Sequence, residues 1–293
     1  MDLNWTIGCL AALGSAAAWA YSSILFRKIG EEVSPAGMVL ANCGVGLLYL
    51  TAALAASGAA PADLRTALTL GASGLLGVAL GGILFFRALM YLGPKLTVLM
   101  GLVCPVVTIV LALVLLHERP SAAAWAGSCL VFAGIALVLW KRFPPEARDK
   151  AVPGILYSLL ATLCTAFSII LAKVGVAELP ALEATFIRQA WAVAGLTVFG
   201  LATGQLKGWL APFKERRLVK FILFSAFVVI FGGFWLSMVS LKYMEASLST
   251  VLIMTEPLFI LPLTALLLKE KVSFRETAGA LIAFSGVALI FLR

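Results

Sequence analysis

The chain has 293 residues, of which 62% are hydrophobic and only 12% are charged, and its mean hydropathy is +1.06. A soluble protein carries about 25% charged residues, so this composition excludes a water-facing globular domain. The net charge of +8 comes from Lys and Arg residues that lie between apolar runs. It therefore indicates membrane orientation and attraction to anionic headgroups, not binding of nucleic acid.

Ten apolar runs follow one another along the chain. A spanning helix needs about 20 apolar residues, and the runs do not alternate as strands would. We therefore expect an all-α integral membrane protein with ten transmembrane helices. The expected spans are 5–26, 35–57, 67–91, 95–116, 121–141, 152–173, 181–203, 218–243, 247–268 and 274–292. Because Asp2 and no basic segment precede the first run, we interpret that run as a permanent span and not as a cleaved signal.

Lys and Arg are distributed unevenly between alternate loops. With the N-terminus outside, fifteen of them lie on the cytoplasmic side and five on the other, leaving out Arg87 and Arg188 within spans. Because cytoplasmic loops are rich in Lys and Arg, we expect both termini outside the cytoplasm. The expected location is the inner (plasma) membrane, crossed many times. The expected partners are the lipid bilayer and a small-molecule substrate, for a chain that acts as a monomer.

The two halves of the chain repeat one another. A shift of 152 residues aligns these pairs: Gly81 with Gly233, Tyr91 with Tyr243, Pro105 with Pro257, Glu118 with Glu270, Gly127 with Gly279 and Gly134 with Gly286. A shift of 146 residues aligns the earlier spans, as in Ser22 with Ser168. The repeats, 1–145 and 146–293, then hold five spans each. Because five is odd, the second repeat enters the membrane upside down, as in transporters built from inverted repeats around a central cavity.

Two aligned stretches carry a family resemblance: LTVLMGLVCPVVTIVLALVLLHERPS (96–121) and LSTVLIMTEPLFILPLTALLLKEKVS (248–273). Each holds a mid-helix Pro, a Leu-rich run, and then Glu and Ser at the next helix boundary. The first spans of the halves, AAAWAYSSILFRK (16–28) and ATLCTAFSIILAK (161–173), share a pattern of small, aromatic and polar residues. These motifs resemble the EamA-type repeat of the drug/metabolite transporter superfamily, including its bacterial aromatic amino-acid exporters. The resemblance implies a transporter and says little about its substrate.

Two charged residues lie deep within the expected spans. Arg188 is seven residues into the seventh span, and Glu256 is about nine residues into the ninth, which enters from the same side. A charge at the bilayer centre costs at least about 2.5–3.5 kcal/mol on insertion scales. We therefore expect both to face the cavity, where they pair or bind an ionic group of the substrate. The alternative is a snorkelling Arg188 and a Glu256 that caps the backbone freed by Pro257. Their equivalents in the first repeat are Asn42 and Cys104, so each charge is present in one half only.

Further candidates for an amphipathic substrate pocket are aromatic and hydroxyl side chains. Besides Asn42, they are Trp19, Tyr21, Ser22, Phe167, Ser168, Trp191 and Trp235. Ordinary helix packing is the competing interpretation. The candidate hinges are Gly81, Gly82, Pro105, Gly232, Gly233 and Pro257, and close packing through glycine is the alternative there.

No catalytic, metal or cofactor site is expected. His117 is the only histidine, and the five cysteines show no metal-ligand spacing. We expect Glu118 and Glu270 to make helix-end interactions with Arg119, Lys269 or Lys271. The prediction is a secondary or facilitative transporter that exports small amphipathic metabolites, with amino acids as first candidates, by alternating access. Coupling to protons through Glu256 stays open. The alternatives are a multidrug or nucleotide-sugar carrier, a membrane-embedded enzyme, and a channel or receptor.

Overall fold

The computed structural model of the chain describes residues 3–27, 33–58, 62–101, 103–139, 148–267 and 273–291, and within them it is helical and contains no strand. Six helical segments are long and apolar enough to cross a membrane: Leu3–Ser23, Pro35–Ser57, Leu64–Leu92, Val152–Glu178, Ala181–Ala202 and Arg216–Tyr243. Three shorter apolar helices are Val103–Leu115, Ala122–Gly134 and Thr277–Ile290. The all-α membrane architecture is therefore confirmed, while the count of ten spans stays a prediction.

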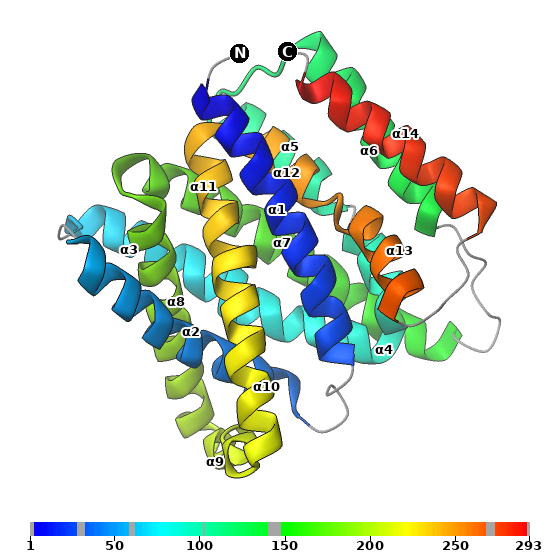
Figure 1. Ribbon diagram of the computed structural model, residues 1–293. Helices are drawn as coiled ribbons and strands as arrows, with labels where there is room; N and C mark the ends of the chain where they lie inside the picture. The colour runs from blue at the N-terminus through cyan, green and yellow to red at the C-terminus, as the bar shows by residue number, and fades with distance from the viewer. Residues whose placement is uncertain are drawn as a thin grey trace.

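The helices follow most of the expected runs (Figure 1), but the expected boundary between 67–91 and 95–116 is wrong, because α4 continues to Gly101 and α5 begins at Val103. Those of the first half are α1 (Leu3–Arg27), α2 (Pro35–Ser57), α3 (Leu64–Ser73), α4 (Gly81–Gly101), α5 (Val103–Leu115) and α6 (Ala122–Leu139). Those of the second half are α7 (Arg148–Glu178), α8 (Ala181–Ala202), α9 (Leu206–Trp209), α10 (Arg216–Phe227), α11 (Leu236–Tyr243), α12 (Ala246–Ile253), α13 (Glu256–Leu267) and α14 (Phe274–Phe291). The π-helical segments η1 (Gly74–Leu80) and η4 (Val228–Trp235) join α3 to α4 and α10 to α11, so each third span is continuous.

The expected ninth span is broken in the structure. The prediction of a single helix over 247–268 is wrong, because α12 ends at Ile253 and α13 begins at Glu256. Pro257 has no N–H with which to continue the hydrogen-bond ladder of α12. The interruption places Glu256 at the first turn of a new helix.

Local sequence sets several of the helix ends. Ser34 caps α2, with its Oγ accepting a hydrogen bond from the Gly37 N–H at 3.2 Å, and Pro35 occupies the first turn. Gly58 ends α2 with a φ of 71°, a left-handed conformation that glycine adopts without strain. Asp63 caps α3 through the Thr66 N–H at 3.4 Å.

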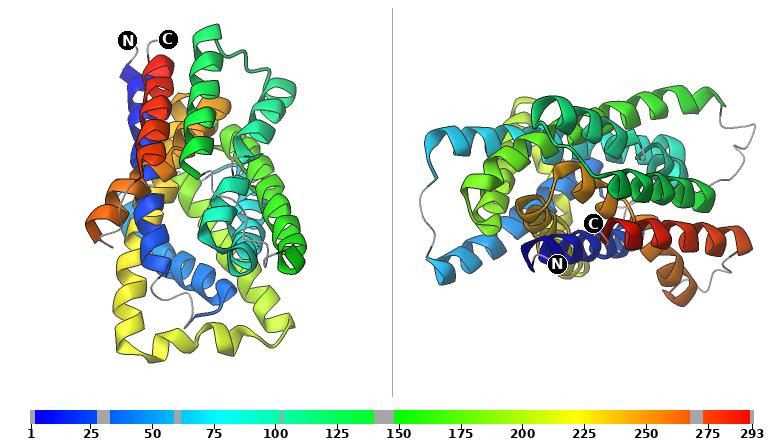
Figure 2. Two further views of the ribbon diagram at one scale, coloured as in Figure 1. Left: turned by 90° about the vertical axis from the view of Figure 1, so that its right-hand side faces the viewer. Right: turned by 90° about the horizontal axis from the view of Figure 1, so that it is seen from above.

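The last spans of the two halves, α6 and α14, pack side by side (Figures 1 and 2). A Cβ atom placed on Gly127 would lie 2.7 Å from the Gly286 carbonyl oxygen, and one placed on Gly134 would lie 2.5 Å from the Gly279 carbonyl oxygen. The helices are therefore antiparallel and approach closely where both carry only glycine. Gly127 thus contacts the repeat equivalent of Gly134, and Gly134 contacts the repeat equivalent of Gly127.

The remaining helices interleave between the halves. α1 packs on η4 and α11, and α7 packs on α3, η1 and α4, so the first span of each half lies against the third span of the other. α2 packs on α8. Both termini lie at one end of the molecule, and α9 and the start of α10 lie at the opposite end (Figure 1).

Candidate functional site

A cavity of about 320 Å³ lies where the two halves meet. Its walls are mostly apolar. Among the residues that the structure describes, only two that line it are charged, and they are Arg188 and Glu256. Their first-repeat equivalents, Asn42 and Cys104, line the same cavity. The aligned pairs Arg188 with Asn42 and Glu256 with Cys104 therefore meet at one site.

Arg188 lies on α8 and is 6% exposed. Its Nη2 donates a hydrogen bond to Ser168 Oγ at 3.1 Å, and Nη1 contacts the Met238 sulfur at 3.3 Å. Its buried Nε has no hydrogen-bond partner, and no carboxylate in the described parts of the chain bonds the guanidinium. Hydrogen bonds thus hold the guanidinium in place while its Nε–H remains without a partner.

Two glycines and two serines fix the position of this arginine. A Cβ atom on Gly74 would collide with the Arg188 carbonyl oxygen, and one on Gly77 would collide with Ser168 Oγ. Ser168 Oγ and Ser73 Oγ each donate to the other's carbonyl oxygen at 2.7 Å, which ties α7 to α3. The backbone of η1 can approach α7 and α8 this closely only because it carries glycine there.

Glu256 opens α13 on another side of the cavity. Its Oε1 accepts a hydrogen bond from Ser23 Oγ of α1 at 2.8 Å. No other bond to this carboxylate is recorded among the described residues, and no ion pair joins it to Arg188. The two opposite charges share the cavity without pairing.

Asn42 shows how the first repeat differs. Its Oδ1 accepts from Ser225 Oγ at 2.9 Å, and its Nδ2 donates to the Met38 carbonyl oxygen at 3.0 Å. Ser225 aligns with Ser73 under the 152-residue shift. Ser225 therefore bonds Asn42, and its equivalent Ser73 bonds Ser168, the partner of Arg188. At this position the first repeat has an uncharged amide where the second has a guanidinium.

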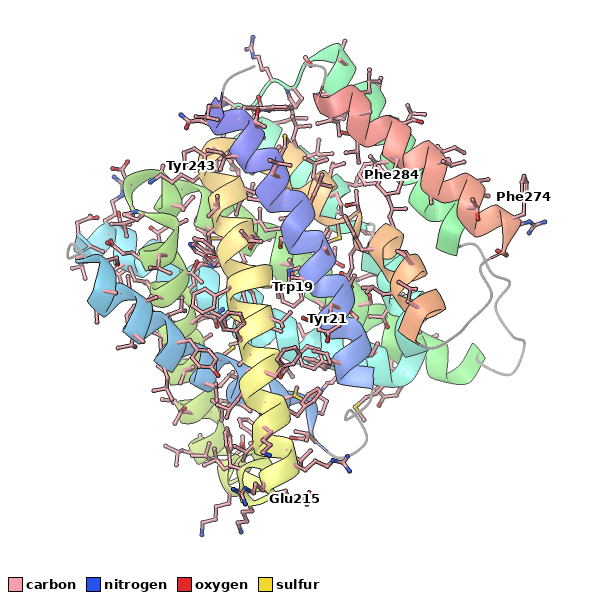
Figure 3. The ribbon with its side chains drawn as sticks, in the orientation of Figure 1. Trp19, Tyr21, Glu215, Tyr243, Phe274 and Phe284 are labelled. Carbon is pink, nitrogen blue, oxygen red and sulfur yellow. The ribbon has the colours of Figure 1, made fainter. Side chains whose placement is uncertain are left out.

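Aromatic rings form much of the apolar wall. Trp19, in the middle of α1 (Figure 3), meets Phe234 edge-on at a centroid distance of 5.0 Å. Phe26 meets Phe86 in the same way at 5.9 Å. The predicted Trp19 is therefore in the lining together with four phenylalanines that sequence analysis did not single out: Phe26, Phe85, Phe86 and Phe234.

Several predicted residues lie outside the lining. Tyr21 packs edge-on against Phe224 at 6.2 Å, and Ser22 donates to the Ala18 carbonyl oxygen of its own helix at 2.7 Å. Phe167 and Trp191 are 46% and 39% exposed, and Trp235 packs against Phe231 at 6.3 Å. Ser168 does not line the cavity itself but holds Arg188 there.

Helical periodicity explains these differences. The lining of α7 recurs every three or four residues, at Ser158, Ala161, Thr162, Thr165 and Ile169. Phe167 lies two residues from Thr165, and Tyr21 lies two residues from Trp19, so each points to the far side of its helix. Aligning the polar positions at this spacing would have identified the inner face from the sequence.

The candidate hinges lie in related places. Gly81 and Gly82 line the cavity just after η1, and Gly232 and Gly233 lie within η4, where a Cβ on Gly233 would be 2.9 Å from the Trp19 ring. Pro105 is buried in α5, and the Pro257 side chain lies outside the described residues. The matching π-helical segments were not predicted. Such segments are frequent at functional sites.

Comparisons with known proteins agree with this architecture. The EamA-like transporter family matches twice, at residues 6–140 and 152–292. An uncharacterized transporter of Archaeoglobus fulgidus is 25% identical over 284 residues, which is 97% of each chain. An uncharacterized transporter of Acidianus ambivalens is 39% identical over 85 residues, 28% of this chain and 33% of the relative. One crystal structure matches the fold with a TM-score of 0.73 at 19% identity, covering 99% of this chain and 98% of the other.

Proposed function

The chain belongs to the EamA-like transporter family, and from that premise we propose that it exports small amphipathic metabolites as a secondary or facilitative transporter. Amino acids, aromatic ones included, are the first candidates. The observation that carries this choice is the cavity of about 320 Å³, which combines Arg188, Glu256 and aromatic walls. Ligand pockets run from about 300 to 1,000 Å³, so the volume favours a compact substrate over a nucleotide sugar. Because the cavity lies within one chain, it also supports a monomeric carrier.

The relation between the repeats supports an inverted arrangement. α6 and α14 are equivalent spans that run antiparallel, with Gly127 against Gly286 and Gly134 against Gly279. That pattern is what a two-fold axis in the membrane plane generates. Two halves related in this way can exchange conformations, which gives alternating access a structural basis.

Contacts at one end of the bundle support the same mechanism. Glu118 accepts hydrogen bonds from the Ala246 N–H at 2.6 Å and from Ser247 Oγ at 2.6 Å, which caps the start of α12. Lys173 Nζ donates to the carbonyl oxygens of Leu241 and Met244 at 2.6 and 2.7 Å, at the end of α11. The helix-end role expected of Glu118 is present, and its partner is the α12 backbone and not Arg119. The Glu118 contacts join the halves at the end of the molecule where the chain termini lie, and the Lys173 contacts tie α7 to α11 within the second repeat.

The cavity lies toward the opposite end. Its lining uses Ser23 and Phe26 from the last turns of α1 and Met38 and Val39 from the first turns of α2. The repeat alignment assigns Arg27 and Glu270 as the counterparts of Lys173 and Glu118. Glu270 and the Arg27 side chain lie outside the described residues. We propose that the contact equivalent to that of Glu118 forms at this end of the cavity in the opposite state, when the Glu118 contacts open.

The test is uptake into proteoliposomes that contain the purified protein, across a panel of amino acids, amines, organic acids and nucleotide sugars. We expect saturable uptake of amino acids above that of protein-free liposomes. Repeating the assay with and without an imposed proton gradient separates secondary from facilitated transport. Uptake confined to nucleotide sugars or to bulky drugs would favour those carriers, and no uptake of any compound would contradict the proposal.

A further inference from the structure

The cavity presents one positive and one negative group that do not pair with each other. Its described lining contains no other charged side chain, so its formal charge sums to zero while its two charges stay apart. We propose that the substrate is a zwitterion whose carboxylate binds Arg188 and whose ammonium group binds Glu256. This assignment rests on the proposed transport function and adds to it the substrate class and the orientation of the substrate.

The Arg188 end suits a carboxylate. Ser168 and Met238 occupy one contact each of Nη2 and Nη1, and Nε has none. A guanidinium carries five N–H donors in a planar fork that matches the two oxygens of a carboxylate. Leaving a buried Nε–H without a partner is unfavourable, so an incoming carboxylate would supply what the resting site lacks.

The Glu256 end suits an ammonium group. Ser23 donates to Oε1 and leaves Oε2 without a recorded partner among the described residues. An ammonium group has three donors and no acceptor, so it can donate to the carboxylate oxygen that Ser23 does not bond. Trp19 and Phe234 in the same cavity offer an aromatic wall to the uncharged part of the substrate.

Different helices hold the two charges. Arg188 is on α8 and is fixed by α7 through Ser168, whereas Glu256 is on α13 and is fixed by α1 through Ser23. A zwitterion that bridges them contacts both helix pairs at once. A ligand with one charge leaves the opposite buried charge without a partner, which is strongly unfavourable.

The first measurement uses the unaltered protein in proteoliposomes and two matched sets of compounds. One set is phenylalanine, 2-phenylethylamine and 3-phenylpropionate; the other is leucine, isoamylamine and 4-methylpentanoate. We expect each amino acid to be taken up at least about tenfold faster than the two analogues that lack one charge, since a site built around a polar group discriminates strongly against its loss. The same compounds are tested for their effect on the melting temperature in detergent, where only the zwitterions should raise it.

Variants then assign each charge. Arg188→Gln is expected to lose phenylalanine uptake and to shift relative preference toward 2-phenylethylamine. Glu256→Gln is expected to shift it toward 3-phenylpropionate. Arg87→Gln is the matched control, because Arg87 lies in a span but outside the cavity lining, 5.6 Å from the centre of the Tyr157 ring. It should keep the preference of the unaltered protein.

The outcomes separate the two proposals. If singly charged analogues are taken up as fast as the amino acids, or if the compounds of the wider panel that are transported are not zwitterions, the inference is overturned while the transporter function stands. Parallel loss of all three phenyl compounds in both Gln variants would also overturn it, because it would indicate a structural role. If a variant fails to insert, the melting-temperature comparison on the unaltered protein still decides. No uptake of any compound contradicts the transport function itself.

Discussion

Nη2 of Arg188 on α8 donates a hydrogen bond to Oγ of Ser168 on α7 at 3.1 Å. The same hydroxyl lies 2.7 Å from the Ser73 carbonyl oxygen of α3, to which it donates. Three helices from both halves therefore meet at the one buried cation of the described cavity lining. Ser22, which aligns with Ser168, makes no such contact and bonds its own helix at Ala18. The repeats thus differ both in the charge at this position and in the contacts of the neighbouring serine.

This relationship predicts unequal effects for two equivalent substitutions. Ser168→Ala removes a hydrogen bond to a charged group, worth about 1.5–3 kcal/mol, so we expect the KM of the transported substrate to rise about tenfold or more. Ser22→Ala removes only a bond within α1 and should change KM less than about twofold. Initial uptake rates over a range of substrate concentrations measure both. Equal effects would show that Ser168 does not position Arg188.

The approach of η1 to α8 predicts a second asymmetry. A Cβ at Gly74 would meet the Arg188 carbonyl oxygen, whereas a Cβ at Gly44 in α2 would meet nothing within 4 Å. Overpacking costs about 1–3 kcal/mol, and in Gly74→Ala the strain falls on the backbone that carries Arg188. We expect Gly74→Ala to lower both the melting temperature in detergent and transport, and Gly44→Ala to leave both near those of the unaltered protein. A fully active Gly74→Ala would contradict the close contact.

Much of this fold follows from the sequence, because apolar length alone locates helices in a chain that must satisfy its backbone within lipid. The break before Glu256 was underestimated: Pro257 predicts a bend, but the residues around it instead end one helix and begin another. The π-helical segments η1 and η4 were not predictable from local patterns. Each lies against the first span of the other half, a tertiary contact that local sequence patterns do not reveal.

The parts of the site that the sequence predicts are the charged residues within apolar spans. Arg188 and Glu256 are charged residues within apolar runs, and both line the cavity. Phe86 could not be predicted, because a phenylalanine within an apolar span looks the same in the sequence wherever its side chain points. Phe86 lines the cavity, whereas Phe284 on α14 is 48% exposed (Figure 3). Only the packing between helices distinguishes the two.

Membrane orientation gives a third prediction. The exposed basic residues around the start of α10 lie at the end of the molecule opposite the termini, where Figure 3 labels Glu215. They are Lys207, Lys214, Arg216, Arg217 and Lys220. By the positive-inside rule we expect this end to face the cytoplasm. Leu3→Cys should then react with a membrane-impermeant maleimide in intact cells, and Lys214→Cys only after permeabilisation. The unaltered protein controls for its own cysteines, and the reverse pattern would contradict the orientation.

The contact between Glu118 and Ser247 provides the sharpest test of alternating access. Glu118 Oε2 lies 2.6 Å from Ser247 Oγ, so cysteines at both positions should crosslink in the state described by the structure. The repeat alignment makes Lys95 and Glu270 the counterpart pair. We expect cysteines at that pair to crosslink as well, in the opposite state, and each crosslink to abolish transport until it is reduced.

If the protein alternates between two states, the Glu118–Ser247 and Lys95–Glu270 crosslinks should not form in the same molecule. In a protein with all four cysteines, a crosslink at the Glu118–Ser247 pair should leave the Lys95–Glu270 pair as free thiols, and the reverse should also hold. Ser240 and Ser249, whose hydroxyls lie 2.8 Å apart across the turn from α11 to α12, provide a control pair within one repeat. That pair should crosslink whichever end is closed, since neither residue crosses between the halves. Mass spectrometry of the peptides separates the species. Both crosslinks in the same molecule would mean that the two ends close together, and a carrier with both ends closed cannot alternate by exchanging these contacts.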